Sequence, residues 1–494
     1  MIDLTINKTT LDSNIKKAKE KGILLPTFSQ MREPATVPAF IKERLKKTGL
    51  WDIDPVNLFR VTWKNEPKES GGLFGDPNFI ELPSELTGVK AKIVCLLGKY
   101  FPTGCHKVGA SIACLTPRLV TGQFDAATQK AVWPSTGNYC RGGAFNSKLL
   151  AVDSVAILPE GMSRERFDWL KTIASEVIAT PGTESNVKEI FDKTNEIKAT
   201  RKDALVFNQF EEMGNYLWHY SVTGPAITEA FEIMARQNAA LNFAGGCFSS
   251  GSAGTMAAGD FFKKKFPQSR LAVGEALQCP TILDNGFGDH RIEGIGDKHI
   301  PWVHNVKNTD MAIAIDDNDC MALLRLFNEA AGKEYLASAL KLNKEQIDSL
   351  AYMGISGIAN MLCCIKFAKY YELGERDVVF TVLTDSVDMY HSRLEELAAA
   401  EGLYTKGKAV HDYAESLAGE TTDNMLELGF KERKRIHNLK YYTWVEQQGR
   451  TAAELNELWD DQEKNFLGVQ KQVEDVDALI NEFNRKTGLL DKHH

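Results

Sequence analysis

Short apolar runs alternate with longer amphipathic segments along this 494-residue chain, and this alternation constrains the fold more than any other feature. Runs such as KIVCLL, KAVW and SVAIL are each followed, after a loop, by a helical pattern of about 10 to 15 residues. Strands and helices in this alternation form βαβ units, in which successive strands lie parallel. The pattern begins near residue 88 and resumes after 240. We therefore predict an α/β fold of two open, twisted, mostly parallel sheets with flanking helices.

Composition and the pattern of apolar residues change along the chain, and these changes divide it into four parts. A proline-containing N-terminal extension over residues 1–80 is expected to pack on the core. We place a small α/β domain over 81–225, a large one over 226–400, and a helical, charged C-terminal extension over 401–494, with a mainly helical stretch from about 185 to 240 joining the halves. Thr451 and Glu454 form a capping box in the tail, which we expect over the core or at a subunit contact.

Composition indicates which binding partners and which cellular compartment to expect for this protein. Apolar residues make up 43% of the chain and the formal net charge is −8, so no global field attracts nucleic acid or an anionic membrane. No run of about 18 apolar residues and no secretory leader pattern is present. The nine cysteines are scattered without a CxxC, which favours a reducing cytoplasm and argues against disulfides or a structural metal site. Cys105, Cys140 and Cys247 lie in Gly-rich loops, as small turn residues or, alternatively, redox groups.

One lysine lies where a solvated lysine is not expected. The stretch PTGCHKVGASIA, residues 102–113, places Lys107 among small residues at the start of an apolar helix. Burial favours the neutral amine, which can form a Schiff base. The alternative is a lone structural lysine in an ion pair.

A second loop, GGCFSSGSAGT at residues 245–255, follows a predicted strand and opens a helix. Gly-flanked N–H groups at a helix start, with Ser and Thr hydroxyls, bind anions. Ser252 stands where a Walker A loop needs lysine, and no register supplies the dinucleotide fingerprint, although Glu275 ends the next strand where a ribose-binding acid would lie. The alternative is a Gly-rich turn that only allows the helix and the strand to pack closely. Together with Lys107, the loop favours a phosphate monoester carried by pyridoxal phosphate.

Two more loops add polar groups after predicted strands. In PSTGN, Ser135, Thr136 and the helix-start N–H groups are suited to a carboxylate, and Asn138 is placed to reach a phenolic oxygen. A simple N-cap turn would explain Ser135 or Thr136 but not Asn138. In TDS, Ser386 is placed to hydrogen-bond a pyridine nitrogen, although Asp-Ser is also a common N-cap pair.

These loops, in this order, resemble the tryptophan-synthase-β-like fold of pyridoxal-phosphate enzymes, in particular the cysteine synthase and cystathionine β-synthase family. The resemblance covers roughly residues 90 to 400. It rests on PTGCHKVGA, PSTGN, MSRERFDWLKTIASEVIATPG, NQF with HYSVTGPAI, GSAGT, HRIEGIGDKHIP, and GISGIANMLC leading into LTDSVDMYHS.

The resemblance implies a role for each matching residue. Lys107 would bond the cofactor and later remove the Cα proton, and Ser386 would meet the pyridine nitrogen. The other residues implied to bind the cofactor are Asn138, Gly251, Ser252, Ala253, Gly254, Thr255, Gly294 and Gly296. Those implied to bind the substrate carboxylate are Ser135, Thr136, Gly137, Asn138 and Gln209.

The implied activity is β-elimination or β-replacement on a small amino acid through an aminoacrylate, as in a cysteine synthase or a cysteine desulfhydrase. Three alternatives stay open: an ammonia-lyase or dehydratase of the same fold, a sulfur or sulfonate lyase, and a β-subunit that depends on a partner. The resemblance further implies a homodimer. His106, which precedes the lysine, departs toward tryptophan synthase and is expected either near the phosphate or satisfied by backbone.

Overall fold

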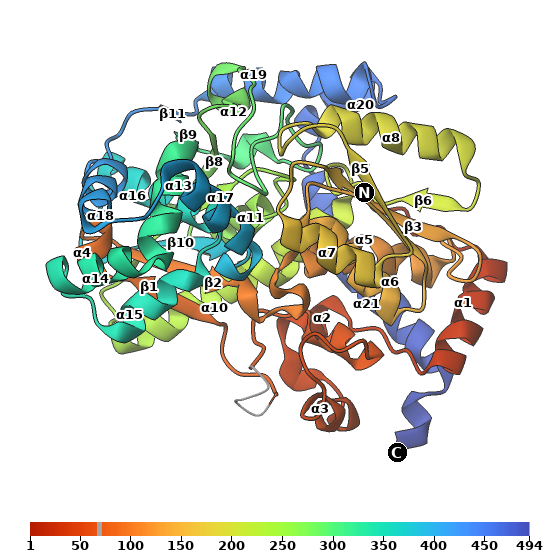
Figure 1. Ribbon diagram of the computed structural model, residues 1–494. Coiled ribbons are helices and arrows are strands. Elements are labelled where there is room, and N and C mark those ends of the chain that lie inside the picture. The colour runs from red at the N-terminus through yellow and green to blue at the C-terminus, as the bar shows by residue number, and fades with distance from the viewer. Residues whose placement is uncertain (67–71, 494) are drawn as a thin grey trace.

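The computed structural model describes residues 1–66 and 72–493 and contains two sheets that lie side by side (Figure 1). The larger sheet has the strand order β1-β2-β10-β7-β8-β9-β11, and the smaller has the order β5-β4-β3-β6. The strands of the larger sheet are β1 (Phe79–Leu82), β2 (Lys92–Leu97), β7 (Asn242–Ser249), β8 (Arg270–Ala276), β9 (Met311–Ile315), β10 (Asp377–Leu383) and β11 (Met425–Glu427). Those of the smaller are β3 (Lys130–Pro134), β4 (Ser154–Pro159), β5 (Glu176–Thr180) and β6 (Ala204–Val206).

Parallel pairing dominates both sheets, as the alternating pattern predicts. All pairs in the smaller sheet are parallel, and in the larger sheet only the edge strands β1 and β11 pair antiparallel. The central strands are buried on both faces, as in β4, where all six residues are buried. The predicted fold class is therefore confirmed.

Helices cover both faces of the two sheets (Figure 1). Around the smaller sheet and between the sheets lie α5 (Lys107–Thr121), α6 (Asn138–Leu149), α7 (Arg164–Ile173), α8 (Val187–Thr200), α9 (Met213–Trp218) and α10 (Gly224–Gln237). The larger sheet carries α11 (Met256–Lys265), α12 (Thr281–Asp284), α13 (Asp317–Asn328), α14 (Ala330–Ala339), α15 (Lys344–Ser349), α16 (Ile355–Tyr370) and α17 (His391–Glu401).

The two ends of the chain pack together beside α5. The N-terminal helices are α1 (Lys8–Lys21), α2 (Phe28–Arg32), α3 (Ala39–Leu45) and α4 (Ser84–Thr87), and the C-terminal ones are α18 (Lys406–Tyr413), α19 (Phe430–Lys440), α20 (Ala452–Asp460) and α21 (Phe466–Thr487). Asn484 of α21 exchanges two hydrogen bonds with the backbone of Leu25, at 2.9 and 2.8 Å. Asp477 accepts from the Phe28 N–H at 2.6 Å. Side chains of α21 thus satisfy backbone groups of the N-terminal segment, which is more than 440 residues away in the sequence.

Two strands differ from the sequence-based expectations. The stretch from 185 to 240 contains β6, which pairs with β3, and the helical tail contains β11, which pairs with β9. Each has three residues, too short for a period of two to be recognised. The capping box at Thr451 is present, with the Glu454 N–H donating to the Thr451 hydroxyl at 3.1 Å.

The strand memberships bear on the proposed division into domains. β1 and β2 precede Lys107 in the sequence but belong to the larger sheet, whereas β3 to β6 make the smaller one. The loop that carries Lys107 therefore crosses from one sheet to the other.

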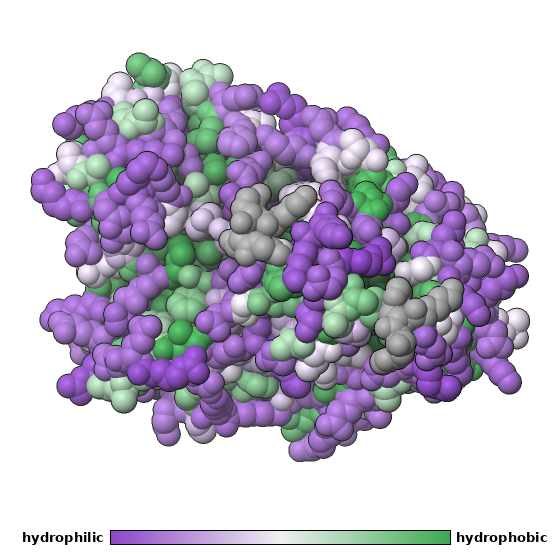
Figure 2. All heavy atoms as spheres, turned by 90° about the horizontal axis from the view of Figure 1, so that it is seen from below, coloured by the Kyte–Doolittle hydropathy of each residue, from purple (hydrophilic) through white to green (hydrophobic). Residues whose placement is uncertain are grey.

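The surface shows no single broad apolar face in the view of Figure 2, where apolar side chains lie in small groups among polar ones. Among the described residues, no single helix is long and apolar enough to cross a membrane. One pair, Lys344–Tyr352 with Ile355–Tyr370, passes that test only jointly and is bent by 112°.

Candidate active site

Lys107 begins α5 at the carboxyl ends of the larger sheet's central strands and points into a cavity between the two sheets. Its Nζ donates to Ser252 Oγ at 2.8 Å and to Gln209 Oε1 at 3.3 Å. Burial lowers the pKa of the Lys107 amine, and the nearby Cys105, Asp297 and Glu184 oppose this shift only in part. The amine is thereby moved toward the neutral form that a nucleophile needs.

The predicted phosphate loop forms one wall of this cavity. β7 ends at Ser249 and α11 begins at Met256, so residues 251–255 lie directly at a helix N-terminus. Among the described residues, the backbone N–H groups of this stretch donate to no other protein group. The cavity is lined by His106, Lys107, Ser249, Gly251, Ser252, Ala253, Gly254, Thr255, Gly294, Ile295, Ser356, Asn360, Val382 and Thr384.

The backbone of this loop requires its small residues. A Cβ on Gly254 would lie 2.2 Å from Asn215 Oδ1, and one on Gly251 would lie 2.5 Å from the Gly294 carbonyl oxygen. Ala253 holds a left-handed φ of 57°, which costs free energy and persists where the surroundings enforce it. Free N–H groups and the Ser252 and Thr255 hydroxyls, with a lysine opposite, fit the phosphate and aldehyde ends of pyridoxal phosphate.

The predicted carboxylate loop approaches the same lysine from the smaller sheet. Gln209 donates through Nε2 to Ser135 Oγ at 3.3 Å while its Oε1 accepts from Lys107, so the three side chains form one chain of hydrogen bonds. Gly137 has a φ of 149°, and a Cβ there would lie 2.4 Å from Arg166 Cδ. The structure therefore brings Ser135, Gln209, Lys107 and the phosphate loop together, as the sequence predicts.

At the end of β10 the structure draws attention to a residue that the sequence analysis did not single out. Asp385 is fully buried, and its Oδ2 accepts from Asn138 Nδ2 at 2.7 Å and from the Tyr390 hydroxyl at 2.8 Å. The Ser386 hydroxyl instead donates to Asp388 at 3.1 Å. Burial raises the pKa of Asp385, and Arg166 opposes that shift. The contact of Ser386 with a pyridine nitrogen stays a prediction.

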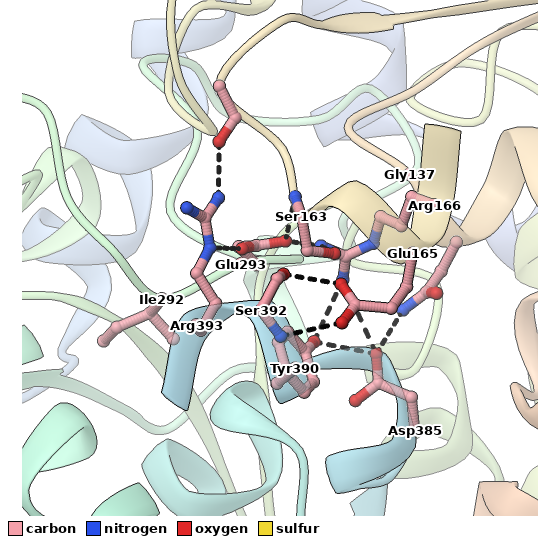
Figure 3. Close-up of polar contacts among 12 residues, drawn as sticks. Gly137, Ser163, Glu165, Arg166, Ile292, Glu293, Asp385, Tyr390, Ser392 and Arg393 are labelled. Atoms are coloured by element: carbon pink, nitrogen blue, oxygen red, sulfur yellow. Dashed lines mark hydrogen bonds and ion pairs between the residues drawn. The ribbon is translucent and has the colours of Figure 1, made fainter. Parts of the chain in front are cut away.

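A buried ionic cluster connects the two sheets behind the carboxylate loop (Figure 3). Arg166 of α7 forms an ion pair with Glu293, donates to the Tyr390 hydroxyl at 3.0 Å and lies 3.6 Å from Asp385. Arg393 of α17 donates to the other oxygen of Glu293 at 2.6 Å. Arginine is suited to such a cluster because its planar guanidinium donates in several directions. The sequence indicated this cluster only through the charged residues of SRERFDW, because the partners of Arg166 lie more than 120 residues away from it.

His106 lines the cavity beside Lys107 as a neutral ring. Burial and the Lys107 charge lower the pKa of His106 to about 3. Its ring lies parallel to that of Trp218 at 6.5 Å, and Nε2 is 3.4 Å from Thr384 Oγ1. The structure thus places His106 in the same cavity lining as residues 251–255, and its proximity to a bound phosphate stays a prediction.

Two further carboxyls face this region and were not expected. Glu184 follows β5 and Asp297 lies in the loop after α12, and both are buried. Both oxygens of Glu184 and Oδ2 of Asp297 lack a hydrogen-bonding partner among the described residues. Desolvation raises the pKa of Glu184 to about 8 and that of Asp297 to about 7. Asp297 lies within the segment HRIEGIGDKHIP but was given no role, and Glu184 lies just beyond MSRERFDWLKTIASEVIATPG, so the sequence analysis singled out neither acid.

Comparisons with known proteins agree with this site. The profile of the family described as pyridoxal-phosphate dependent enzyme matches residues 75–340, more than half of the chain. A cysteine synthase of Staphylococcus aureus is 28% identical over 262 residues, which are 53% of this chain and 75% of that protein. A probable cysteine synthase of Bacillus subtilis is 26% identical over 51% of this chain and 79% of its own.

Solved structures share the fold. An O-acetylserine dependent cystathionine beta-synthase from Helicobacter pylori aligns with a TM-score of 0.53 at 23% identity, over 64% of this chain and 94% of its own. A cysteine synthase from Entamoeba histolytica aligns with a TM-score of 0.56 at 19% identity, over 70% and 93% respectively. At these identities the structures establish the fold alone.

Proposed function

Because this chain belongs to the family of pyridoxal-phosphate dependent enzymes, we propose that it catalyses β-elimination or β-replacement on a small amino acid, in the manner of a cysteine synthase or a cysteine desulfhydrase. Its cofactor is pyridoxal phosphate. The observation that carries the proposal is the position of Lys107, which contacts the phosphate loop through Ser252 and the carboxylate loop through Gln209.

The residues divide into those that hold the cofactor and those that hold the substrate. Lys107 would bond the cofactor's aldehyde carbon and Gly251–Thr255 its phosphate, with Asn138, Gly294, Gly296 and Ser386 along its edges. When bound, pyridoxal phosphate supplies an electron sink that makes the substrate's Cα proton removable. Lys107 Nζ is placed to accept that proton, because burial keeps the amine toward its neutral form.

The substrate's carboxylate would be received by the loop at Ser135, Thr136, Gly137 and Asn138, with Gln209 donating beside it. Arg166, which is paired with Glu293, packs against this loop at Gly137. Such positioning fixes the orientation of Cα and Cβ relative to Lys107, which is a main source of rate enhancement.

Membership of the family does not establish the specific reaction, the oligomeric state or the location, which are part of the proposal. The names of two relatives favour sulfur-containing products, since both are cysteine synthases. Ammonia-lyase, dehydratase and sulfur or sulfonate lyase activities, and dependence on a partner, are the alternatives. The homodimer, the cytoplasmic location and the division into domains stay predictions.

A product assay tests the proposal. The cofactor-loaded protein is mixed with single amino acids, namely O-acetylserine, cysteine, serine, threonine, cysteate and 2,3-diaminopropionate, with and without sulfide. Formation of cysteine from O-acetylserine and sulfide would identify a replacing synthase, and pyruvate with sulfide or ammonia would identify a lyase. Failure of every substrate, and of β-chloroalanine, to release its β-substituent would overturn the proposal.

A further inference from the structure

Asn215 of α9 joins the two residues to which the Lys107 amine is hydrogen-bonded. Its Nδ2 donates to the Ser252 hydroxyl at 3.1 Å and to the backbone carbonyl of Gln209 at 2.9 Å. Asn215 is 0% exposed, and its Oδ1 lies so close to the phosphate loop that a Cβ on Gly254 would be 2.2 Å from it. One buried amide therefore contacts both the loop proposed to bind the cofactor's phosphate and a residue proposed to bind the substrate's carboxylate.

The contacts of the Ser252 hydroxyl leave its proton available to a ligand. A serine hydroxyl can accept two hydrogen bonds and donate one. Ser252 Oγ accepts from Lys107 Nζ at 2.8 Å and from Asn215 Nδ2 at 3.1 Å, so both of its acceptor positions are filled. Its O–H remains as a donor, and Ser252 lines the cavity in which the cofactor's phosphate is proposed to bind. Asn215 thus holds the Ser252 hydroxyl as a donor toward an anion.

Tyr216, the next residue of α9, connects this amide to two other helices. Its hydroxyl donates to Asp260 Oδ2 at 2.5 Å, and Asp260 belongs to α11, the helix that follows the phosphate loop. The same hydroxyl accepts from Gln470 Nε2 of α21 at 2.7 Å. Tyr216 is 1% exposed, and Asp260 and Gln470 are each 6% exposed, so water competes little for these hydrogen bonds. The Tyr216 hydroxyl therefore ties α9 to α11 and to the C-terminal helix.

The two anchors of Tyr216 are themselves held in place. Asn305 Nδ2 donates to Asp260 Oδ2 at 2.8 Å, and Asn308 donates to Asp260 Oδ1. Lys264 of α11 donates to Gln470 Oε1 at 2.6 Å, so α21 is also bonded directly to α11. Hydrogen bonds that share partners in a buried region restrict one another's geometry. The position of the Tyr216 hydroxyl is therefore set by three separate segments of the chain.

We propose that Tyr216 and Asn215 are positioning residues, through which α21 of the C-terminal extension fixes the Ser252 hydroxyl as a donor to the cofactor's phosphate. Tyr216, anchored on Asp260 and Gln470, fixes Asn215, and Asn215 acts through Ser252. This inference rests on the roles given to the loops under the proposed function. It adds a role for a segment outside the family match, because the matching family profile ends at residue 340 and α21 lies beyond it.

The test compares the binding of pyridoxal phosphate with that of pyridoxal, which has the aldehyde but no phosphate. Wild type and variants are freed of cofactor, their folding is verified, and both dissociation constants are measured by visible absorbance. We expect Tyr216→Phe to weaken binding of pyridoxal phosphate about 3- to 10-fold, Asn215→Leu about 10-fold or more and Gln470→Met about 2- to 5-fold, because each removes hydrogen bonds from a buried network. Binding of pyridoxal should change by less than about 2-fold, because it lacks the group that Ser252 receives.

Tyr404→Phe is the matched control. Tyr404 is 4% exposed and donates its hydroxyl to the buried Asp412 at 3.0 Å, so this variant also deprives a buried aspartate of a tyrosine donor. Tyr404 belongs to the same C-terminal extension but lies outside the lining of the Lys107 cavity. It should lose stability as Tyr216→Phe does, yet bind pyridoxal phosphate as wild type does.

A double variant tests the route of the effect. Because Tyr216 acts through the Ser252 hydroxyl, adding Tyr216→Phe to Ser252→Ala should weaken binding of pyridoxal phosphate by less than about 2-fold beyond Ser252→Ala alone. Wild-type affinity in Tyr216→Phe, an equal loss in Tyr404→Phe, equal losses for the two compounds, or full additivity with Ser252→Ala would overturn this inference and leave the proposed function standing. A wild type that binds the cofactor but releases no β-substituent in the product assay would instead count against the proposed function alone.

Discussion

Replacing Arg166 by methionine tests whether the buried cluster holds the two sheets together. Arg166, Glu293 and Asp385 are 1%, 3% and 0% exposed at their side chains, so the variant leaves two carboxyls in the interior without their shared cation. Removing one partner of a buried ion pair costs about 3–5 kcal/mol in the free energy of unfolding. Proton uptake by the stranded carboxyls limits the loss, since each unit of pKa shift is worth about 1.4 kcal/mol.

Arg393→Met is the matched control within the same cluster. Arg393 donates to Glu293 at 2.6 Å, but its side chain is 23% exposed, and its removal leaves Arg166 on Glu293. The loss expected for this variant is about 1–2 kcal/mol, the value of a hydrogen bond to a charged group that water can partly replace.

The assay is urea denaturation at pH 8 and pH 5.5, followed by fluorescence and circular dichroism so that separate transitions are seen. The Arg166→Met deficit should be smaller at pH 5.5, because burial already raises the pKa of Asp385, Arg166 is the cation that opposes that shift, and the stranded carboxyl is increasingly protonated there. Equal deficits for the two variants, or an Arg166→Met deficit that is the same at both pH values, would refute the argument from a buried, unpaired charge.

Three further outcomes follow from the site. Lys107→Ala should abolish turnover and the visible absorbance of a lysine-bound cofactor; a variant that keeps both would remove Lys107 from its assigned role. Gly254→Ala places a Cβ 2.2 Å from Asn215 Oδ1 and should weaken cofactor binding about 10-fold or more, whereas Gly374→Ala, with 3.9 Å to its nearest atom, should not. Glu184→Gln should raise the free energy of unfolding at pH 8 by about 2–5 kcal/mol, because the raised pKa of Glu184 means that stability is lost as pH rises from about 4.5 to about 8. Urea midpoints at pH 8 and pH 4.5 check this last prediction, and a gain that persists undiminished at pH 4.5 would contradict it.

Local features carried much of the prediction. Each strand or helix pattern, the glycines and hydroxyls of GSAGT, and the small residues around Lys107 are each encoded in one short stretch of the sequence. Backbone N–H groups at a helix start bind anions whatever lies elsewhere, so residues 251–255 could be predicted from the sequence as a phosphate loop. The same locality explains the misses, since β6 and β11 are only three residues long and owe their extended form to β3 and β9.

The amino-acid sequence by itself determined the α/β class, and it indicated the loops that we propose bind the cofactor and the lysine between them. Tertiary structure alone decided which distant polar groups meet: Arg166 with Glu293 and Asp385, and Asp385 with Asn138. The reason is physical. An isolated Glu or Asp in a loop reads as a solvated side chain, and its pKa and partner are set only when packing removes water and brings in a group from more than 100 residues away.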